Sequence, residues 1–452
     1  MSNNRARRPS VCLDAFNISL AKGFGIATYA RNLNVALRGL GHETHLLYGP
    51  ERGLERDPLL SEIALFDSPI PPSSFPIHGA VGRSLRIARS PWGRTARRVA
   101  GSGEVIIDHV ARRAPPADAL WASHDLFHTA NRAHSAFGRF TPLKFEGGPA
   151  GAGAPDIVHW TCPLPLHAAG RPNLYTLHDL VPLRLPFATL DNKRRYLQLC
   201  RQICAVADQI VTVSEHSKRD LVRILGLPEE RVSVTYQAVS LPPALLAVDD
   251  QTAATELEGV FGLNWQDYFV FFGAIEPKKN LARVIEAYLS SGASSPLVIV
   301  GGKGWLDDEE TRLLYPDLVQ VSTMHEGVIR RADRVRAYEY LPFSLLATLI
   351  RGAKGVLAPF LYEGFGLPVL EAMLLGAPVM GSTGGSLPEV AGEAALLVDP
   401  YDVEAMRQAI RTLDADADLR AELSRRGRQQ AELFSPEAYQ TRLKDLYRPF
   451  AA

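Results

Sequence analysis

The stretch FLYEGFGLPVLEAMLLGAPV (Phe360–Val379) joins a glycine-rich loop to an apolar helix pattern that stops at Gly376. Glu363 and Glu371 stand on either side of the loop. On a single helix the two carboxylates would lie about 12 Å apart along the axis and about 80° apart around it, which is too far for a coupled acid–base pair. We therefore expect Glu363 in the loop and Glu371 in the first turns of a helix, with Pro368 at a first helical position.

The start of this helix is suited to binding an anion. Its first N–H groups carry partial positive charge and favour phosphate. Gly364 and Gly366, with Phe365 and Leu367 beside them, let a ligand approach the backbone closely. A carboxylate on each side accepts hydrogen bonds from hydroxyl groups, so the stretch predicts a nucleotide-sugar site. The alternative is an ordinary strand-to-helix turn with solvated carboxylates.

Strands and helices alternate on both sides of this stretch. SVCLDAF (Ser10–Phe16) and YFVFFGAI (Tyr268–Ile275) are typical of buried strands that open two alternating series. The pattern predicts two doubly wound α/β domains that face each other across a cleft. We expect an N-terminal acceptor-binding domain, a linker, a nucleotide-sugar-binding domain and a final helix that packs back on the first domain, over residues 1–240, 241–265, 266–434 and 435–452. Residues 50–155 are irregular and predict inserted helices and loops.

Composition excludes several classes of protein. The chain has 452 residues, 46% of them hydrophobic, and a formal net charge of zero, so nothing indicates a nucleic-acid partner. Its four cysteines are too scattered for a disulfide scaffold, and Cys200 and Cys204 are interpreted as core thiols. Neither a signal peptide nor a membrane-spanning run is evident. We expect a cytoplasmic protein.

Two further loops carry suitable chemistry. EPKKN (Glu276–Asn280) follows a predicted strand, and Lys278 and Lys279 would neutralise a diphosphate there, although paired lysines are usually surface charge. KGFGIATY (Lys22–Tyr29) is a second glycine loop that opens a helix, with Gly23 and Gly25. It lacks the spacing of the dinucleotide-binding G-x-G-x-x-G fingerprint.

Together these motifs resemble retaining GT-B-fold enzymes of glycosyltransferase family 4. The resemblance is carried by LAPFLYEGFGLPVLEAMLLGAPVMGSTGGSLPEVAGEAALLVDP, whose glutamates match the family's E-x7-E motif, and by FFGAIEPKKNLARVIEAY, VTVSEHSKRDL, LYTLHDLVPL and GFGIATYARNL. It covers most of the chain except roughly residues 50–155.

The resemblance implies a role for each matching position. Glu371 would bind the ribose hydroxyls. Glu363 and the backbone of residues 364–367 would hold the transferred sugar and the distal phosphate. Lys279 would contact the diphosphate, and His178 would lie near the anomeric carbon. Gly23 and Gly25 would let the first helix approach the phosphates or the acceptor.

Two positions depart from the family pattern. Ala274 stands where many relatives have an arginine, a charge that Lys278 would replace, and Gln237-Ala238 stands where an Asn-Gly turn is common. Each of three residues expected on the acceptor side could instead have a purely structural role. His178 and His159 suit a structural hydrogen-bonding role at strand ends, and Asp179 would either orient His178 or cap a turn.

The expected reaction is retaining transfer of a hexose, without a metal cofactor. No carboxylate stands out as a nucleophile, so departure of the diphosphate would be assisted by the lysines and the helix N–H groups. LDADAD (Leu413–Asp418) is interpreted as a helix cap. Relatives with TLHDLVPL imply a lipid-linked or polysaccharide glycan acceptor in bacterial surface-glycan synthesis. They favour a GDP-sugar over a UDP-sugar, either GDP-mannose or a GDP-deoxyhexose.

Eight arginines between Arg83 and Arg113, with Trp92 among them, suggest contact with anionic membrane at the inner face, or else a solvated basic surface. Two rival functions stay open at this point. One is a nucleotide-sugar epimerase, and the other is a non-catalytic partner subunit of a glycan synthase.

Overall fold

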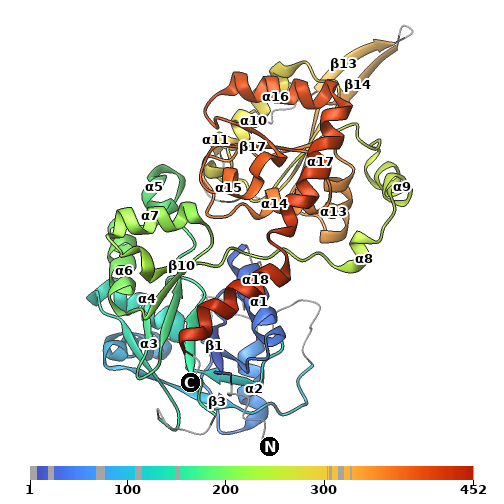
Figure 1. Ribbon diagram of the computed structural model, residues 1–452. Coiled ribbons are helices and arrows are strands. Elements are labelled where there is room, and N and C mark those ends of the chain that lie inside the picture. The colour runs from blue at the N-terminus through green and yellow to red at the C-terminus, as the bar shows by residue number, and fades with distance from the viewer. Residues whose placement is uncertain are drawn as a thin grey trace, which may run out of the picture.

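Two α/β domains lie one above the other, and a helix of the C-terminal segment returns to the lower, N-terminal domain (Figure 1). The two-domain α/β fold expected from the sequence is confirmed. The computed structural model describes residues 8–18, 25–67, 77–106, 115–148, 153–302, 304, 308–313, 320–325 and 328–450.

Within the described residues, the N-terminal sheet has the strand order β10-β9-β8-β6-β1-β2-β4-β3-β5-β7. β3 pairs antiparallel with β4, so β3, β5 and β7 run against the other strands. β1, β2, β6 and β8 are buried along their whole length, as parallel strands covered on both faces must be. The strands are β1 (Val11–Asp14), β2 (Thr44–Tyr48), β3 (Arg94–Val99), β4 (Ala119–Ala122), β5 (Thr141–Phe145), β6 (Ile157–Trp160), β7 (Leu166–Ala168), β8 (Asn173–Thr176), β9 (Gln209–Thr212) and β10 (Val232–Val234).

The irregular stretch 50–155 contains helices, as expected, but it also supplies strands to this sheet, which the sequence did not predict. It supplies β4, which pairs with β2 and buries Trp121, and also β3 and β5. β3 carries three arginines and buries only Ala96 and Val99. Because no apolar run marks β3, the sequence pattern concealed it.

Helices cover this sheet, and some of them begin with a capping side chain. Ser214, for example, accepts a hydrogen bond from Ser217 N (3.0 Å) and so caps α7. Cys200 and Cys204 lie on α6 as buried free thiols, as expected. The helices are α1 (Gly25–Gly39), α2 (Pro58–Phe66), α3 (Ile77–Arg89), α4 (Leu126–Phe137), α5 (Val181–Arg184), α6 (Lys193–Val206) and α7 (Glu215–Leu225).

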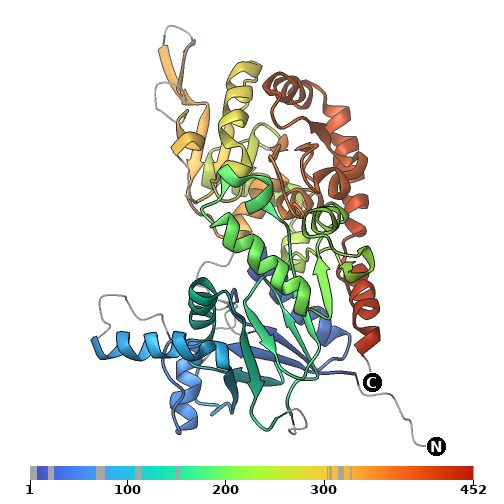
Figure 2. The same ribbon diagram turned by 90° about the vertical axis from the view of Figure 1, so that its left-hand side faces the viewer.

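The C-terminal domain has a parallel sheet in the order β15-β12-β11-β16-β17-β18. Its strands are β11 (Phe269–Phe272), β12 (Leu297–Val300), β15 (Val335–Tyr338), β16 (Gly355–Leu357), β17 (Val379–Ser382) and β18 (Leu396–Val398). Its helices are α10 (Leu281–Ser291), α11 (Asp308–Thr311), α13 (Phe343–Arg351), α14 (Leu367–Leu374), α15 (Leu387–Ala391), α16 (Val403–Ala415) and α17 (Ala417–Glu432). Asp416, within LDADAD, caps α17 through Leu419 N, as expected. A hairpin of β13 (Gln320–His325) and β14 (Val328–Asp333) projects from the top of this domain (Figures 1 and 2).

Two segments connect the domains. The expected linker, residues 241–265, contains the helices α8 (Pro243–Leu246) and α9 (Asp250–Phe261), and α9 buries Leu257 and Phe261 in the core that includes the C-terminal domain. The last helix, α18 (Pro436–Tyr447), packs against α1. In Figure 2 α18 (red) runs from the upper domain down along the lower one.

Candidate active site

The centre of the site lies where the loops after β11 and β16 meet, because these strands are neighbours in the C-terminal sheet. Leu361 N donates to Lys278 O (2.8 Å), which holds the two loops together. Lys279 Nζ then lies 2.5 Å from Glu363 Oε1, and both side chains are buried. Lys278 Nζ lies 3.9 Å from the same oxygen. The lysines and Glu363 predicted from the sequence therefore form one charged cluster.

Burial and pairing act against each other in this cluster. Burial alone would raise the pKa of Glu363, but Lys278 and Lys279 lower it overall. Burial alone would likewise lower the pKa of Lys278, but Glu363 and Glu276 raise it overall. The charged forms are therefore favoured at neutral pH. Lys278, expected to supply the charge missing at Ala274, does lie in the cluster.

Glu371 lies one turn inside α14, as expected, while Glu363 stays in the preceding loop. Gly366 caps the helix with φ 99°, a left-handed conformation that favours glycine. Glu371 is half-buried, and burial raises its pKa to about 7 although Lys279 acts in the opposite direction. Its carboxyl group therefore changes charge near neutral pH.

Gly364 is the point at which this loop touches the N-terminal domain. A Cβ atom added at Gly364 would lie 2.7 Å from Asp179 Oδ2 and 3.0 Å from His178 O, so only glycine fits. The carbonyl oxygen of Gly364 accepts hydrogen bonds from Ser214 Oγ (2.6 Å) and Ser217 Oγ (3.3 Å) at the start of α7. The loop is thus held by both domains.

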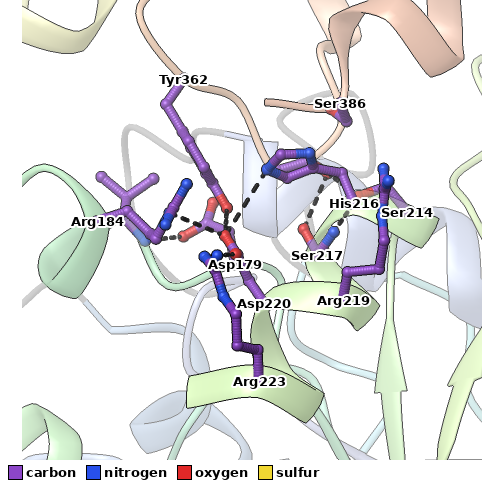
Figure 3. A network of polar contacts seen from close by, with 12 residues as sticks. Asp179, Arg184, Ser214, His216, Ser217, Arg219, Asp220, Arg223, Tyr362 and Ser386 are labelled. Carbon is purple, nitrogen blue, oxygen red and sulfur yellow. Dashed lines mark hydrogen bonds and ion pairs between the residues drawn. The ribbon is translucent and has the colours of Figure 1, made fainter. Parts of the chain in front are cut away.

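A second interdomain contact is centred on Asp220 of α7, which is buried. Tyr362 reaches down from the C-terminal loop and its hydroxyl donates to Asp220 Oδ2 (2.7 Å), as Figure 3 shows. Arg223 and Arg184 lie 2.9 and 3.2 Å from the same carboxylate. Because Tyr362 and Gly364 flank Glu363, these contacts fix the position of Glu363 from both sides.

Glu389 of α15 makes a third contact between the domains. Its carboxylate accepts hydrogen bonds from Glu215 N (2.8 Å) and His216 N (3.1 Å) at the N-terminus of α7. The positive end of the helix dipole favours this anion. The contact joins the LPEV segment of the E-x7-E signature to the N-terminal domain.

His178 follows β8 and faces this loop region. Its Nε2 lies 2.9 Å from Thr161 O, and a carbonyl oxygen only accepts, so Nε2 carries the proton and Nδ1 is left as an acceptor. Burial lowers the pKa of His178, which keeps the ring neutral. Asp179 Oδ1 accepts from Val181 N (3.0 Å), a contact within the turn that precedes α5.

His159 does not belong to the site, and its expected place on the acceptor side was wrong. The side chain is fully buried in β6, with Nδ1 2.5 Å from Tyr447 Oη and Nε2 2.8 Å from Thr176 Oγ1. Burial lowers the pKa of His159 to about 3. His159 is a structural residue that links β6 to α18.

The first residues of α1 and α14 approach each other between the two domains. Gly25 begins α1, and a Cβ atom there would lie 3.5 Å from Leu367 Cδ1, at the first residue of α14. Two helix N-termini therefore face one region, close to the charged cluster. Gly23 lies outside the described residues. Within the described part of the chain, no group of three His, Cys, Asp or Glu side chains is arranged to hold a metal ion.

The arginine-rich stretch is divided by the structure. Arg83 and Arg86 lie 3.8 and 3.7 Å from Asp125 Oδ2, so they face the protein and not a flat outer surface. Trp92 is 81% exposed. Arg112 and Arg113 lie outside the described residues. In the part of the chain that the structure describes, no helix is both long and apolar enough to cross a membrane.

Sequence reasoning missed the residues that join the two halves. The sequence indicated Ser214 only as a helix cap. It placed Glu389 within the family signature but gave no sign of its contact with the N-terminal domain. Tyr236 follows β10 with φ 59° and directly precedes Gln237-Ala238, the pair that departs from the Asn-Gly turn. Its ring centroid lies 6.3 Å from that of Phe365 and 5.4 Å from that of Phe434. The departure therefore lies beside a strained position.

Comparisons with known proteins show which proteins this chain is similar to. Residues 261–430 match the family described as glycosyl transferases group 1, and residues 150–241 match glycosyltransferase family 4. The O-antigen chain mannosyltransferase B of Escherichia coli is 33% identical over 60% of this chain and 69% of its own length. The serotype-specific mannosyltransferase WbdA of Escherichia coli is 27% identical over 62% of this chain and 35% of its own length. Sucrose-phosphate synthase from Thermosynechococcus elongatus shares the GT-B fold, with a TM-score of 0.64 at 18% identity, over 98% of this chain and 99% of that structure.

Proposed function

Because the chain belongs to glycosyltransferase family 4, we propose that it transfers mannose from GDP-mannose to a hydroxyl group of a bacterial surface glycan, with retention at the anomeric carbon. The observation that carries the proposal is the meeting of two helix N-termini, those of α1 and α14, beside Lys278 and Lys279. Glu276 and Glu363 balance the charges of the two lysines, so the N–H groups at the two helix N-termini supply the further positive charge that a diphosphate requires. A GDP-deoxyhexose is the second donor to test.

The residues around the cluster take separate roles in the proposal. Glu371, when ionised, accepts hydrogen bonds from the two ribose hydroxyls. Glu363 accepts hydrogen bonds from the hexose hydroxyls, and its position is fixed by Tyr362 and Gly364. His178 Nδ1 accepts from a sugar hydroxyl close to the anomeric carbon. These interactions hold both substrates in a reactive arrangement.

The proposed step is a substitution on one face of the sugar. The acceptor oxygen bonds to the anomeric carbon while the bond from that carbon to the phosphate oxygen breaks, and the hydroxyl proton moves to the departing phosphate. A double displacement would need a carboxylate close under the anomeric carbon. Glu363 is already bound to Lys279, which makes it a poor nucleophile. The helix N–H groups and the nearby lysines would stabilise the charge of GDP, so we propose that no metal ion is needed.

The proposal is tested by calorimetry of the purified protein with GDP-, UDP-, ADP- and dTDP-sugars, with and without EDTA. We expect GDP-mannose to bind most tightly and EDTA to have no effect. Release of GDP in the presence of a lipid-linked glycan then separates an enzyme from a non-catalytic partner subunit. Preference for another nucleotide would refute the donor, and loss of binding with EDTA would refute metal independence.

A further inference from the structure

A pocket of about 320 Å³ lies in the N-terminal domain, outside the donor cluster. Its lining includes Arg94 and Arg97 of β3 and Ser123 and His124 after β4. Its volume falls in the range of ligand sites. None of the described residues that line it is acidic, so the pocket presents a positive surface.

Positive charge also gathers behind the lining. Arg83 and Arg86 of α3 both approach Asp125, the residue after His124. Burial lowers the pKa of Arg94, and repulsion from Arg86 lowers it further. The positive charge at this pocket would therefore stabilise a bound anion.

The lining is held in place by hydrogen bonds. Arg94 Nη2 donates to His124 O (2.5 Å), and His124 Nε2 lies 2.9 Å from Glu51 O. Asp125 has φ 52°, an uncommon conformation for a residue other than glycine. Its strained turn places His124 at the pocket while α4 begins at the next residue. Such fixed geometry is typical of a binding site.

The pocket shares an edge of the sheet with the candidate active site. Ser123 follows β4 and His178 follows β8, and the strands between them, β6, β1 and β2, are parallel to both. The carboxyl ends of these strands form one edge. Four strand spacings separate β8 from β4, which corresponds to roughly 19 Å. A ligand in the pocket would thus lie along the cleft, away from the point of transfer.

We propose that this pocket binds an anionic group of an extended acceptor glycan, a phosphate or a carboxylate, while the acceptor hydroxyl lies at His178. The inference rests on the proposed function for the identity of the acceptor. Arginine side chains bind both kinds of oxyanion through paired hydrogen bonds. The distance selects acceptors whose charge lies several bonds beyond the reacting sugar.

The test uses calorimetry with mannose 1-phosphate, methyl glucuronide and methyl mannoside as phosphate, carboxylate and neutral probes. GDP is present at saturation so that the donor site is filled. The variants are R94Q/R97Q and, because Arg94 holds the lining, R97Q alone, since Arg97 is exposed. R98Q is the matched control, because Arg98 is also exposed on β3 but is not part of the lining.

We expect an anionic probe to bind the wild type, to bind R94Q/R97Q at least tenfold more weakly and R97Q several-fold more weakly, and to bind R98Q unchanged. Binding of mannose 1-phosphate alone would identify a phosphate, and binding of the glucuronide alone a carboxylate. Equal binding to R97Q and wild type, or no binding of either anion, would overturn the inference. Failure of GDP to bind, with anion binding intact, would instead refute the proposed donor site.

Discussion

The two halves of the cleft handle charge in opposite ways. In the C-terminal half, Lys279 and Glu363 are buried and lie 2.5 Å apart, so each charge has a partner before a ligand arrives. In the N-terminal pocket, two arginines line an open space and Asp125 lies behind them, already close to Arg83 and Arg86. Buried pairs are little screened by salt, whereas exposed charges are screened strongly.

This difference separates positioning from attraction. A paired, buried cluster changes little when substrate binds, which suits stabilisation of charge that develops during the reaction. The arginines that line the N-terminal pocket are partly exposed and gain the most electrostatic stabilisation when an anion binds, which suits capture of a substrate. Added salt should therefore weaken acceptor capture more than it slows the chemical step.

We expect the largest effect from Lys279→Met, which disrupts the paired charges of the C-terminal half. This change removes the cation nearest Glu363 and leaves that carboxylate buried beside Lys278 alone. We expect kcat for GDP-mannose turnover to fall by about 10²- to 10³-fold, as when one charge-stabilising donor is removed from an active site. Steady-state kinetics measure this.

Lys354→Met is the matched control for that change. Lys354 pairs with Asp414 at 2.9 Å, just before β16 and therefore at the opposite end of the strand from the site. Its loss should lower the thermal midpoint while kcat stays within twofold. Equal losses of kcat in both variants would mean that the cluster acts through stability and not through charge.

His178→Ala tests the N-terminal half at its contact with the sugar. In the proposed function the nucleotide is bound mainly by the C-terminal domain, so we expect the Kd for GDP to change by less than twofold. Turnover should fall by about 10²-fold, because a positioned acceptor of a hydrogen bond is lost. The buried His159→Gln serves as the comparison and should lower stability with turnover preserved in the folded protein. A large rise in the Kd for GDP would place His178 in the donor site.

Glu371→Gln tests the C-terminal half through the pH dependence of its stability. Because burial raises the pKa of Glu371 to about 7, its protonated form contributes to the stability of the protein without ligand. This contribution is fully present below the ordinary glutamate pKa of 4.5 and is lost as the pH rises through about 7. The neutral glutamine avoids that loss, so the variant should melt at a higher temperature than wild type at pH 8.

Nucleotide binding by the same variant should move the other way. Wild-type affinity for GDP should rise about tenfold between pH 6 and pH 8 as Glu371 ionises. The variant should lose that pH dependence and bind about tenfold more weakly at pH 8. Calorimetry at both pH values measures this, and an unchanged pH profile would remove Glu371 from the ribose contact.

The sequence predicted the two halves to different degrees, for a physical reason. Glu363, Glu371, Lys278 and Lys279 lie in two short motifs after neighbouring strands, so their meeting follows from the parallel fold. The pocket joins β3 to residues after β4, and β3 lacks an apolar run, so neither its strand nor its partners were visible. The sequence pattern also misplaced His159, because it does not distinguish a buried histidine at a strand end from an exposed one.

The smallest effect concerns the contact that holds the halves together. Tyr362→Phe removes the hydroxyl that donates to Asp220, while Arg223 and Arg184 keep the carboxylate paired. A hydrogen bond to a charged group contributes about 1.5–3 kcal/mol, so the thermal midpoint should fall. Turnover should drop only a few-fold, because Ser214 still holds Gly364 and the lysines still hold Glu363.

Tyr288→Phe is the control. It removes a comparable buried hydrogen bond, from the Tyr288 hydroxyl to Ser295 O at 2.9 Å within the C-terminal domain, and should lower stability without a change in turnover. If the two variants behave alike in kinetic assays, Tyr362 contributes to stability alone, and the position of Glu363 depends on the C-terminal half without help from α7.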